Sequence, residues 1–446
     1  MRTPHLLRRL GTAVAAMALT STVLGTPAAE AKATFVQPFM GWSSWSLESS
    51  SRAGYGTGWL IDSHIRGAAD ALSGKLKSAG YRYINIDAGW NATFGWVFHT
   101  DVNGIPDPEP TRFPDGIAPL ASYVHGKGLK LGLYAVTGLE KEVYNKNAPI
   151  AGTSCHAQDI AVQPLTPSNM WGGNWKIDFG NPCAQAYYDS IVKRFASWGV
   201  DFVKVDGTTA DNVPDIAAWS KAINHSGRRM WLTASAWPVP RPAGPALGPY
   251  ANGVRVDTDV ECYCNTVATW DNSVKARWAD VPGWQGVFGR GFRPDLDSMP
   301  ISNNTGSGIQ DGINDVERQS VMTFWSLNSA PLYVGGDIYF LDDKAVSILS
   351  NPEVIAVDQS GLDAVQVTGG ATQVWKQQGM YGRQVAAVFN LGSTPADITV
   401  KWSDLGLSSG WHPVRDLVAR GNLGWFGGSW TASAVPPHGS RLIAIG

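Results

Sequence analysis

The sequence predicts an α/β protein: a (β/α)₈ (TIM) barrel followed by a C-terminal antiparallel β-sandwich domain. Two observations predict this architecture. Short apolar segments alternate with helix-like segments over most of the chain, and the pattern then changes to short strands separated by glycine and proline. We therefore expect a leader at residues 1–33, a barrel at 34–362 and a sandwich at 363–446.

The barrel strands are expected where short apolar runs end in turn residues. These runs are 39–45, 81–87, 130–136, 203–206, 230–235, 254–259, 297–301 and 332–335. Helices are expected where apolar residues recur at helical spacing. These segments are 68–78, 120–127, 184–198, 216–224, 317–328 and 344–349.

The last part of the chain shows period-two alternation without an intervening helix. Its expected strands are 373–376, 384–389, 397–401 and 440–445. This region carries no cluster of catalytic side chains, so packing support for the barrel is the expected role. An accessory sugar site is the alternative.

The first residues have the pattern of an export signal. Arg2, Arg8 and Arg9 form a basic start, an apolar stretch follows at 10–25, and small residues near Ala31 fit a cleavage site. No later stretch is long and apolar enough to cross a bilayer. We expect a secreted protein that does not associate with a membrane.

The charge balance and the aromatic content indicate which kinds of molecule this protein is expected to bind. The chain has 35 basic and 37 acidic residues, which makes nucleic acid an unlikely partner. It also has 20 tryptophans, whose rings pack the core and can also stack on the apolar faces of sugars. An oligo- or polysaccharide substrate is favoured.

Four cysteines are present, an even number in an exported chain. Four allow three pairings, and the expected one joins Cys155 to Cys183 and Cys262 to Cys264. A zinc site is the competing interpretation, but the chain lacks a second CxxC and convergent histidines. We expect no metal and no cofactor.

The stretch 201–207 (DFVKVDG) is the centre of the functional hypothesis. Lys204 and Asp206 lie two residues apart in an otherwise apolar strand and therefore share a face. Buried charges are costly unless each is paired. A structural ion pair is one interpretation, and a catalytic carboxylate at the carboxyl end of a barrel strand is the other.

Two further carboxylates are expected at the same rim. Asp87 ends the second predicted strand and Asp259 the sixth, where Arg255, Asp257 and Asp259 alternate on one face. A carboxylate pair across a pocket can perform glycoside hydrolysis. The stretch 257–261 could instead be a calcium loop, but it lacks the turn glycine and the later glutamate.

Several motifs together resemble glycoside hydrolase family 27, the α-galactosidase (melibiase) family. They are 39–45 (FMGWSSW), 80–87 (GYRYINID), 131–134 (LGLY), 203–207 (VKVDG), 330–332 (APL), 354–359 (VIAVDQ) and 436–442 (PPHGSRL). The likeness runs in order along essentially the whole chain after the leader. It implies a retaining mechanism on a barrel with a C-terminal β domain.

The resemblance implies catalytic roles for four residues. Asp206 is similar to the nucleophile, Lys204 to its electrostatic partner and Asp259 to the acid/base, with Arg255 holding the sugar near C2. In a retaining enzyme the two carboxylates lie roughly 5–6 Å apart.

The resemblance also implies substrate-binding residues. Trp45 and Tyr134 are similar to pocket walls, and Asp87 to an acceptor for a sugar hydroxyl. Trp237 is a further candidate for substrate contact.

Three positions depart from the family pattern. Ala88 stands where a second aspartate usually contacts the C4–C6 side of galactose, and Ala236 where a glutamate commonly precedes Trp-Pro. A hydrogen bond to a charged acceptor is worth roughly 1.5–3 kcal/mol, enough to change sugar preference. Thr208 replaces a cysteine, so Cys155 needs a different partner from the family's.

Three hypotheses follow. The first is a secreted, retaining, exo-acting glycosidase of the α-galactosidase type. The second keeps the fold but changes specificity: space at Ala88 would suit an isomaltodextranase-like activity, and space at Ala236 an α-N-acetylgalactosaminidase-like one. The third is a non-catalytic carbohydrate-binding protein, which intact Asp206, Lys204, Arg255 and Asp259 argue against.

Overall fold

The computed structural model describes residues 1, 32, 34–35, 37–93, 95–235, 243–289, 291–379 and 383–446. Two residues discussed above, Ala236 and Trp237, lie outside the described residues.

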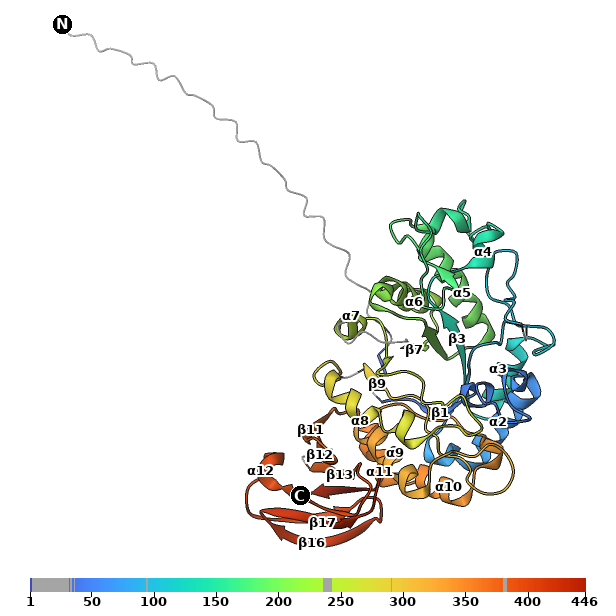
Figure 1. The fold of residues 1–446 in the computed structure, drawn as a ribbon. Helices are drawn as coiled ribbons and strands as arrows, with labels where there is room; N and C mark the ends of the chain where they lie inside the picture. Colours follow the sequence, from blue (N-terminus) through green and yellow to red (C-terminus); the bar gives the residue numbers. More distant parts are fainter. Residues whose placement is uncertain are drawn as a thin grey trace. The chain divides into compact units, whose positions relative to one another are not determined.

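Eight parallel strands form the barrel sheet (Figure 1). They are β1 (Met40–Ser43), β2 (Tyr83–Ile86), β3 (Lys130–Val136), β6 (Phe202–Asp206), β7 (Trp231–Ala234), β8 (Gly253–Arg255), β9 (Arg293–Asp295) and β10 (Leu332–Val334). The sheet order is β10-β1-β2-β3-β6-β7-β8-β9. Met299, just after β9, forms a parallel bridge with Val334 of β10, so the sheet closes on itself.

Two strand predictions need correction. The sixth strand ends at Arg255, so Asp259 lies in the following loop and the expected alternation through Asp257 is wrong. The seventh strand is Arg293–Asp295 rather than 297–301. Its Arg-Pro-Asp sequence does not look like a buried strand, yet Asp295 is buried and accepts a hydrogen bond from the Tyr333 hydroxyl at 3.1 Å. A strand whose charged residues find partners inside the barrel is missed when strands are predicted from apolar runs.

Helices follow most of the strands. The longer ones are α2 (Asp62–Lys75), α3 (Ile117–Gly126), α5 (Cys183–Trp198), α6 (Val213–Ser226), α9 (Asp315–Leu327), α10 (Asp343–Leu349) and α11 (Pro352–Gln359). The shorter ones in this part of the chain are α1 (Trp45–Glu48), α4 (Lys141–Asn145), α7 (Gly244–Leu247) and α8 (Arg277–Asp280).

Local sequence explains where these helices form and end. In α5, Tyr188, Val192 and Phe195 recur at helical spacing and are buried. Gly199 ends α5 in the left-handed conformation with φ 88°. Asn314 caps α9 by accepting hydrogen bonds from the first-turn amides, in a capping box with Glu317.

The C-terminal region forms two antiparallel sheets (Figure 1). Its strands are β11 (Ala364–Thr368), β12 (Thr372–Gln378), β13 (Gln384–Asn390), β14 (Ala396–Lys401), β15 (Trp411–Asp416), β16 (Gly421–Gly427), β17 (Ser429–Val435) and β18 (Ser440–Ile445). β14 pairs with β17, and the other six strands form the larger sheet. Val388 and Ile443 of the larger sheet share a core with Ile398 and Val400 of the smaller one. A short helix, α12 (Trp402–Leu405), interrupts the strands, contrary to prediction.

Aromatic rings join the sandwich to the barrel helices. Trp278 of α8 stacks on Phe324 of α9 with ring centroids 4.2 Å apart. Phe389 of β13 meets Trp278 edge-on at 5.4 Å, and Trp375 of β12 meets Phe324 at 5.1 Å. These contacts fit the expected supporting role of the sandwich.

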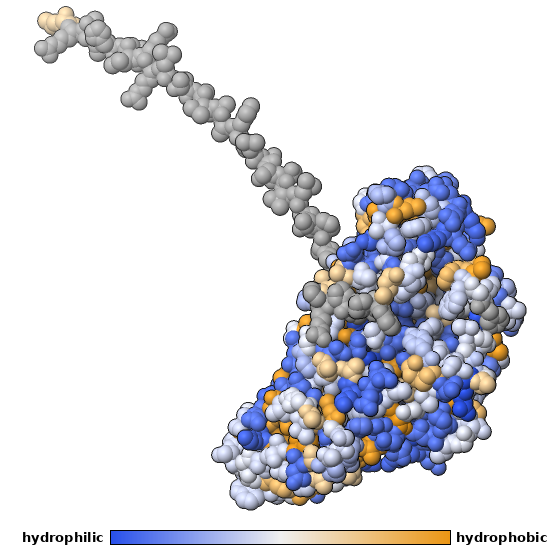
Figure 2. All heavy atoms as spheres, in the orientation of Figure 1, coloured by the Kyte–Doolittle hydropathy of each residue, from blue (hydrophilic) through white to orange (hydrophobic). Residues whose placement is uncertain are grey.

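Exposed apolar side chains on the surface give a first indication of where the functional site lies. On the face drawn in Figure 2, hydrophobic residues form separate patches between hydrophilic ones. Among the described residues, Trp96, Met170, Trp171 and Tyr263 are large, exposed and apolar, and all four line one cavity. In the part of the chain that the structure describes, no helix could cross a membrane.

Candidate active site

The cavity lies at the carboxyl ends of the barrel strands and has a volume of about 580 Å³. Four of the residues that line it follow or end strands in different parts of the sheet, namely Trp45, Ala88, Asp206 and Asp259, and Tyr134 lies near the end of β3. Parallel barrels bring these chain positions together at one rim. The cavity is large enough for a sugar residue with a substituent.

Asp206 is the last residue of β6, a strand whose Phe202, Val203 and Val205 are buried. Its Oδ1 accepts a hydrogen bond from the Gly207 amide at 2.8 Å, and its Oδ2 from the Tyr134 hydroxyl at 3.2 Å. Burial raises the pKa of Asp206, and nearby Lys204 opposes that effect.

The turn after Asp206 requires glycine. Gly207 has φ 72°, and a Cβ there would lie 2.7 Å from Cβ of Asn169. This close approach places the loop that carries Asn169 directly against the end of β6.

Lys204 has a different direct partner from the one expected. Its Nζ donates to Oδ2 of Asp87 at 2.8 Å, and the Asp87 side chain is only 4% exposed. Burial lowers the pKa of Lys204, but Asp87 and then Asp206 raise it above its ordinary value. Lys204 therefore stays charged and acts on Asp206 through space.

Asp259 is held by two donors. Nη2 of Arg255 donates to its Oδ1 at 2.8 Å, and the Tyr263 hydroxyl donates to its Oδ2. Burial raises the pKa of Asp259, but Arg255 and Lys204 outweigh it and bring the pKa below its ordinary value. Asp259 is therefore ionised in the sugar-free site.

Arg255 is 2% exposed, and its Nη2 also donates to Asp297. The resemblance implies that Arg255 contacts the sugar, whereas the structure shows its guanidinium engaged with two carboxylates. Arg255 thus positions Asp259 in the sugar-free site.

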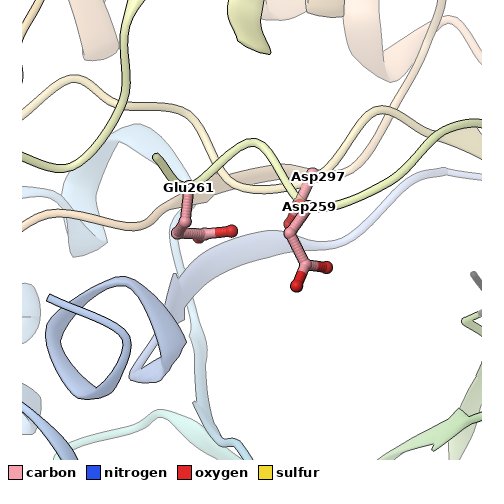
Figure 3. Close-up of side chains that lie close together, drawn as sticks. All are labelled: Asp259, Glu261 and Asp297. Atoms are coloured by element: carbon pink, nitrogen blue, oxygen red, sulfur yellow. The ribbon is translucent and has the colours of Figure 1, made fainter. Parts of the chain in front are cut away.

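Three carboxyl groups converge beside Arg255. Figure 3 shows Asp259, Glu261 and Asp297, whose oxygens lie within 4.8 Å of one another. Glu261 accepts hydrogen bonds from the hydroxyls of Ser46 at 2.5 Å and Ser298 at 2.9 Å. Burial, followed by Asp297 and Asp259, raises the pKa of Glu261 well above its ordinary range.

Two guanidinium groups lie beside this cluster. Arg255 contacts both Asp259 and Asp297, whereas Arg277 donates to Asp257 at 2.7 Å and lies 4.0 Å from Asp297.

Both disulfides in the structure constrain loops around the cavity. Cys155 pairs with Cys183, which begins α5, and Cys262 pairs with Cys264 in the loop that carries Asp259. Trp45 begins α1, and its ring lies 6.5 Å from that of Tyr263, so the two aromatic side chains form one wall.

Several lining residues were not identified from the sequence. They are Trp96, Phe98, Glu140, Met170, Trp171 and Tyr263. The tryptophan content was the available signal, but it did not single out Trp96 or Trp171. Tyr263 lies four residues after Asp259, a spacing that carries meaning only once the loop conformation is known.

Carboxylates at the ends of parallel strands, around a cavity of sugar size and walled by aromatic rings, define a glycoside hydrolase of the barrel type. The family model described as "Alpha galactosidase A" matches residues 37–147 and 174–360, and "Alpha galactosidase C-terminal beta sandwich domain" matches 369–445. The chain belongs to the α-galactosidase family, glycoside hydrolase family 27.

Known relatives are similar to this chain over most of its length. An α-galactosidase from Coffea arabica is 32% identical, over 92% of this chain and 93% of its own. The structure of a β-L-arabinopyranosidase from Geobacillus stearothermophilus has a TM-score of 0.81 at 28% identity, covering 92% of this chain and 96% of that one. A variant of that enzyme is known in complex with arabinose. α-Galactosidase I from Mortierella vinacea has a TM-score of 0.71 at 25% identity, covering 92% and 97%.

The buried Lys204–Asp87 pair generates a stability prediction. Lys204→Met leaves Asp87 buried without its cation, which should lower the free energy of unfolding by roughly 3–5 kcal/mol. Adding Asp87→Asn should restore part of the loss, because the uncompensated charge is removed. Urea unfolding followed by fluorescence measures both variants.

The matched control is Lys176→Met, which removes an exposed pair with Asp211. Such a pair is worth at most about 1 kcal/mol. A Lys204→Met variant no less stable than the Lys176→Met control would contradict the prediction.

Proposed function

We propose that this protein is a secreted, retaining, exo-acting glycoside hydrolase of the α-galactosidase type, which acts on an oligo- or polysaccharide. The observation that carries the proposal is that Asp206, at the end of β6, and Asp259, in the loop after β8, line one cavity, each held by its own donors. The same geometry argues against a protein that only binds carbohydrate.

In the first step an oxygen of Asp206 bonds to the anomeric carbon as the glycosidic bond breaks, and Asp259 gives its proton to the departing oxygen. In the second step water attacks the anomeric carbon, the bond to Asp206 breaks, and Asp259 takes the proton from water. Lys204 and the Tyr134 hydroxyl stabilise Asp206 as it regains its charge.

This mechanism needs a particular placement of protons. Asp206 must be ionised and Asp259 protonated, whereas the sugar-free site favours an ionised Asp259 and a raised pKa at Asp206. A bound sugar excludes water near Asp259 and competes for its donors, and both effects raise the pKa of that carboxyl. Substrate binding therefore prepares the acid.

Export is supported by the leader pattern of residues 1–33 and by the two disulfides. The domain division at about residue 362 is supported by β11, which begins at Ala364, and by the separate matches of the two family models.

A second candidate concerns which sugar is hydrolysed. Ala88 lines the cavity and offers no hydrogen bond, so a hydroxymethyl group next to it has no polar partner there. A β-L-arabinopyranoside has the ring of galactose without that group, and a similar enzyme is a β-L-arabinopyranosidase. This specificity is the second candidate.

A panel of nitrophenyl glycosides tests the proposed function and separates the candidates. It contains the α-galactoside, α-glucoside, α-N-acetylgalactosaminide and β-L-arabinopyranoside, together with dextran and galactomannan. The α-galactosidase proposal expects the α-galactoside to be preferred, and a preference for the arabinopyranoside favours the second candidate. Binding of these sugars without hydrolysis would favour the carbohydrate-binding alternative.

The nucleophile is tested with Asp206→Asn. Turnover should fall at least roughly 1,000-fold, because an amide cannot form the glycosyl-enzyme. Sugar binding, measured by calorimetry, should persist. The control is Asp211→Asn, whose side chain is 67% exposed; full turnover by Asp206→Asn would reject the assignment.

The acid/base is tested with Asp259→Ala and a series of leaving groups. Activity on natural linkages should fall by about 10²–10⁴-fold, because general acid catalysis contributes that much to the departure of a poor leaving group. A dinitrophenyl glycoside needs no proton for departure and should be far less affected in the first step. Equal losses for both substrates would count against this role.

Tyr263→Phe tests the control of proton position. The Tyr263 hydroxyl stabilises ionised Asp259, so its removal should raise the pKa of Asp259. Because the acid must be protonated, the alkaline limb of the kcat/KM profile should move to higher pH. Tyr123→Phe, which removes a surface hydrogen bond to Asp70, is the control, and an unchanged alkaline limb would disprove the link.

A further inference from the structure

The loop that carries Asp259 contains a small covalent ring. A disulfide joins Cys262 to Cys264 across a single residue, so the backbone of Tyr263 is part of the ring. The Cα atoms of the two cysteines lie 5.2 Å apart. Two residues of extended chain would span roughly 6.6–7.2 Å, so the ring excludes an extended conformation at Tyr263.

Tyr263 has a backbone conformation that a free chain seldom adopts. Its φ is 52°, in the left-handed region that bulky side chains rarely occupy. The usual cost of this conformation corresponds to a population about tenfold below that of the right-handed one. Backbone hydrogen bonds hold both ends of the ring: the Cys262 amide donates to the Val267 carbonyl at 3.1 Å, and the Cys264 carbonyl accepts from the Ser51 amide at 3.0 Å.

Side-chain packing does little to fix Tyr263. The residue is 49% exposed. Its hydroxyl donates to Asp259, and its ring meets that of Trp45 edge-on with centroids 6.5 Å apart. A half-exposed side chain keeps much of its rotational freedom unless the backbone holds it. The position of the hydroxyl therefore depends on the conformation of the ring.

A general gain in stability does not account for such a short ring. A disulfide stabilises a fold mainly by restricting the unfolded chain, and the effect grows with the length of the loop that it closes. The sequence separation is 28 for Cys155–Cys183 but only 2 for Cys262–Cys264. The short ring restricts the unfolded chain very little, so its main effect is on the local conformation of the folded loop.

We propose that the Cys262–Cys264 disulfide is a positioning element of the active site, which holds the Tyr263 hydroxyl on Asp259. This inference rests on the proposed function, because the hydroxyl matters to the reaction only if Asp259 gives and takes a proton. With the ring closed, the hydroxyl stabilises ionised Asp259. With the ring open, Tyr263 leaves the left-handed conformation and the pKa of Asp259 rises.

The other titratable groups that face Asp259 lie outside the ring. They are Arg255 of β8, Lys204 and Asp206 of β6, Tyr134 of β3, Asp297 after β9, and Glu261 of the same loop. Glu261 directly precedes Cys262, but the hydroxyls of Ser46 and Ser298 hold its carboxyl group. Opening the ring therefore acts on Asp259 through Tyr263.

The test is the pH profile of kcat/KM for the double variant Cys262→Ser/Cys264→Ser. Its alkaline limb should move up by about one pH unit, the shift expected when a charged group loses one hydrogen bond. An acid with a raised pKa stays protonated to higher pH. The matched control, Cys155→Ser/Cys183→Ser, removes the other disulfide and should leave the limb in place. An unmoved limb in the first variant, or equal shifts in both, would overturn the proposal.

A double-mutant comparison tests whether the ring acts through Tyr263. Tyr263→Phe added to Cys262→Ser/Cys264→Ser should shift the limb no further, because the hydroxyl has already left Asp259. A further shift as large as that of Tyr263→Phe alone would mean that ring and hydroxyl act independently, and would reject the proposal.

Reduction of the folded wild-type protein gives the same comparison without a substitution. Dithiothreitol transfers two electrons and two protons to the disulfide sulfurs and itself becomes a cyclic disulfide. Alkylation followed by mass spectrometry identifies the pair that has opened. Reduction of Cys262–Cys264 should move the alkaline limb up, and reoxidation should restore it. A limb that stays in place after this pair has opened contradicts the proposal.

A measurement without turnover separates this inference from the proposed function. Carboxyl NMR titration of the sugar-free protein reports the pKa of Asp259, which opening the ring should raise by about one unit. A raised pKa together with equal losses for all leaving groups in Asp259→Ala would support the ring and reject the acid/base assignment. An unchanged pKa together with the expected leaving-group pattern would do the reverse.

Discussion

Charge compensation at the mouth of the barrel is the constraint on which the site depends. Asp87 is buried, and partial burial disfavours the charged forms of Asp206 and Asp259 at the same rim. Two cations meet this cost: Lys204 pairs with Asp87, and Arg255 pairs with Asp259. Both cations come from barrel strands, so the same elements that build the sheet fix the electrostatics of the cavity.

This arrangement gives the two central carboxylates different environments. Among the described residues, Asp206 accepts hydrogen bonds from a backbone amide and a tyrosine hydroxyl, whereas Asp259 accepts from a buried guanidinium and a second tyrosine. The difference favours the ionised form of Asp259. In the proposed mechanism, the binding of the sugar then raises the pKa of Asp259 and so prepares it for acid catalysis.

The sequence alone predicted the barrel and the sandwich, because the spacing of apolar residues indicates strands and helices. It also placed Asp87, Asp206 and Asp259 at one rim, although Asp259 lies in the loop after β8 and not at the end of a strand. It did not predict β9, since Arg293 and Asp295 look polar until their partners are known. From the sequence, Lys204 was paired with Asp206, because the two residues lie on the same strand. Its actual partner, Asp87, is distant in the sequence and was missed. The rim around Trp171 depends on loop conformation, which no periodic pattern encodes.

The division between strand ends and loops also explains how chemistry and specificity are separated. Asp206 lies in a strand, and the turn after it tolerates only glycine, so the reacting centre has little freedom to vary. Ala88 and Trp171 lie in loops after β2 and β3, where a change of side chain or an inserted segment leaves the sheet intact. Ala88 and Trp171 line the same cavity as Asp206, so changes at these loop positions alter what the cavity admits without altering how the barrel is built.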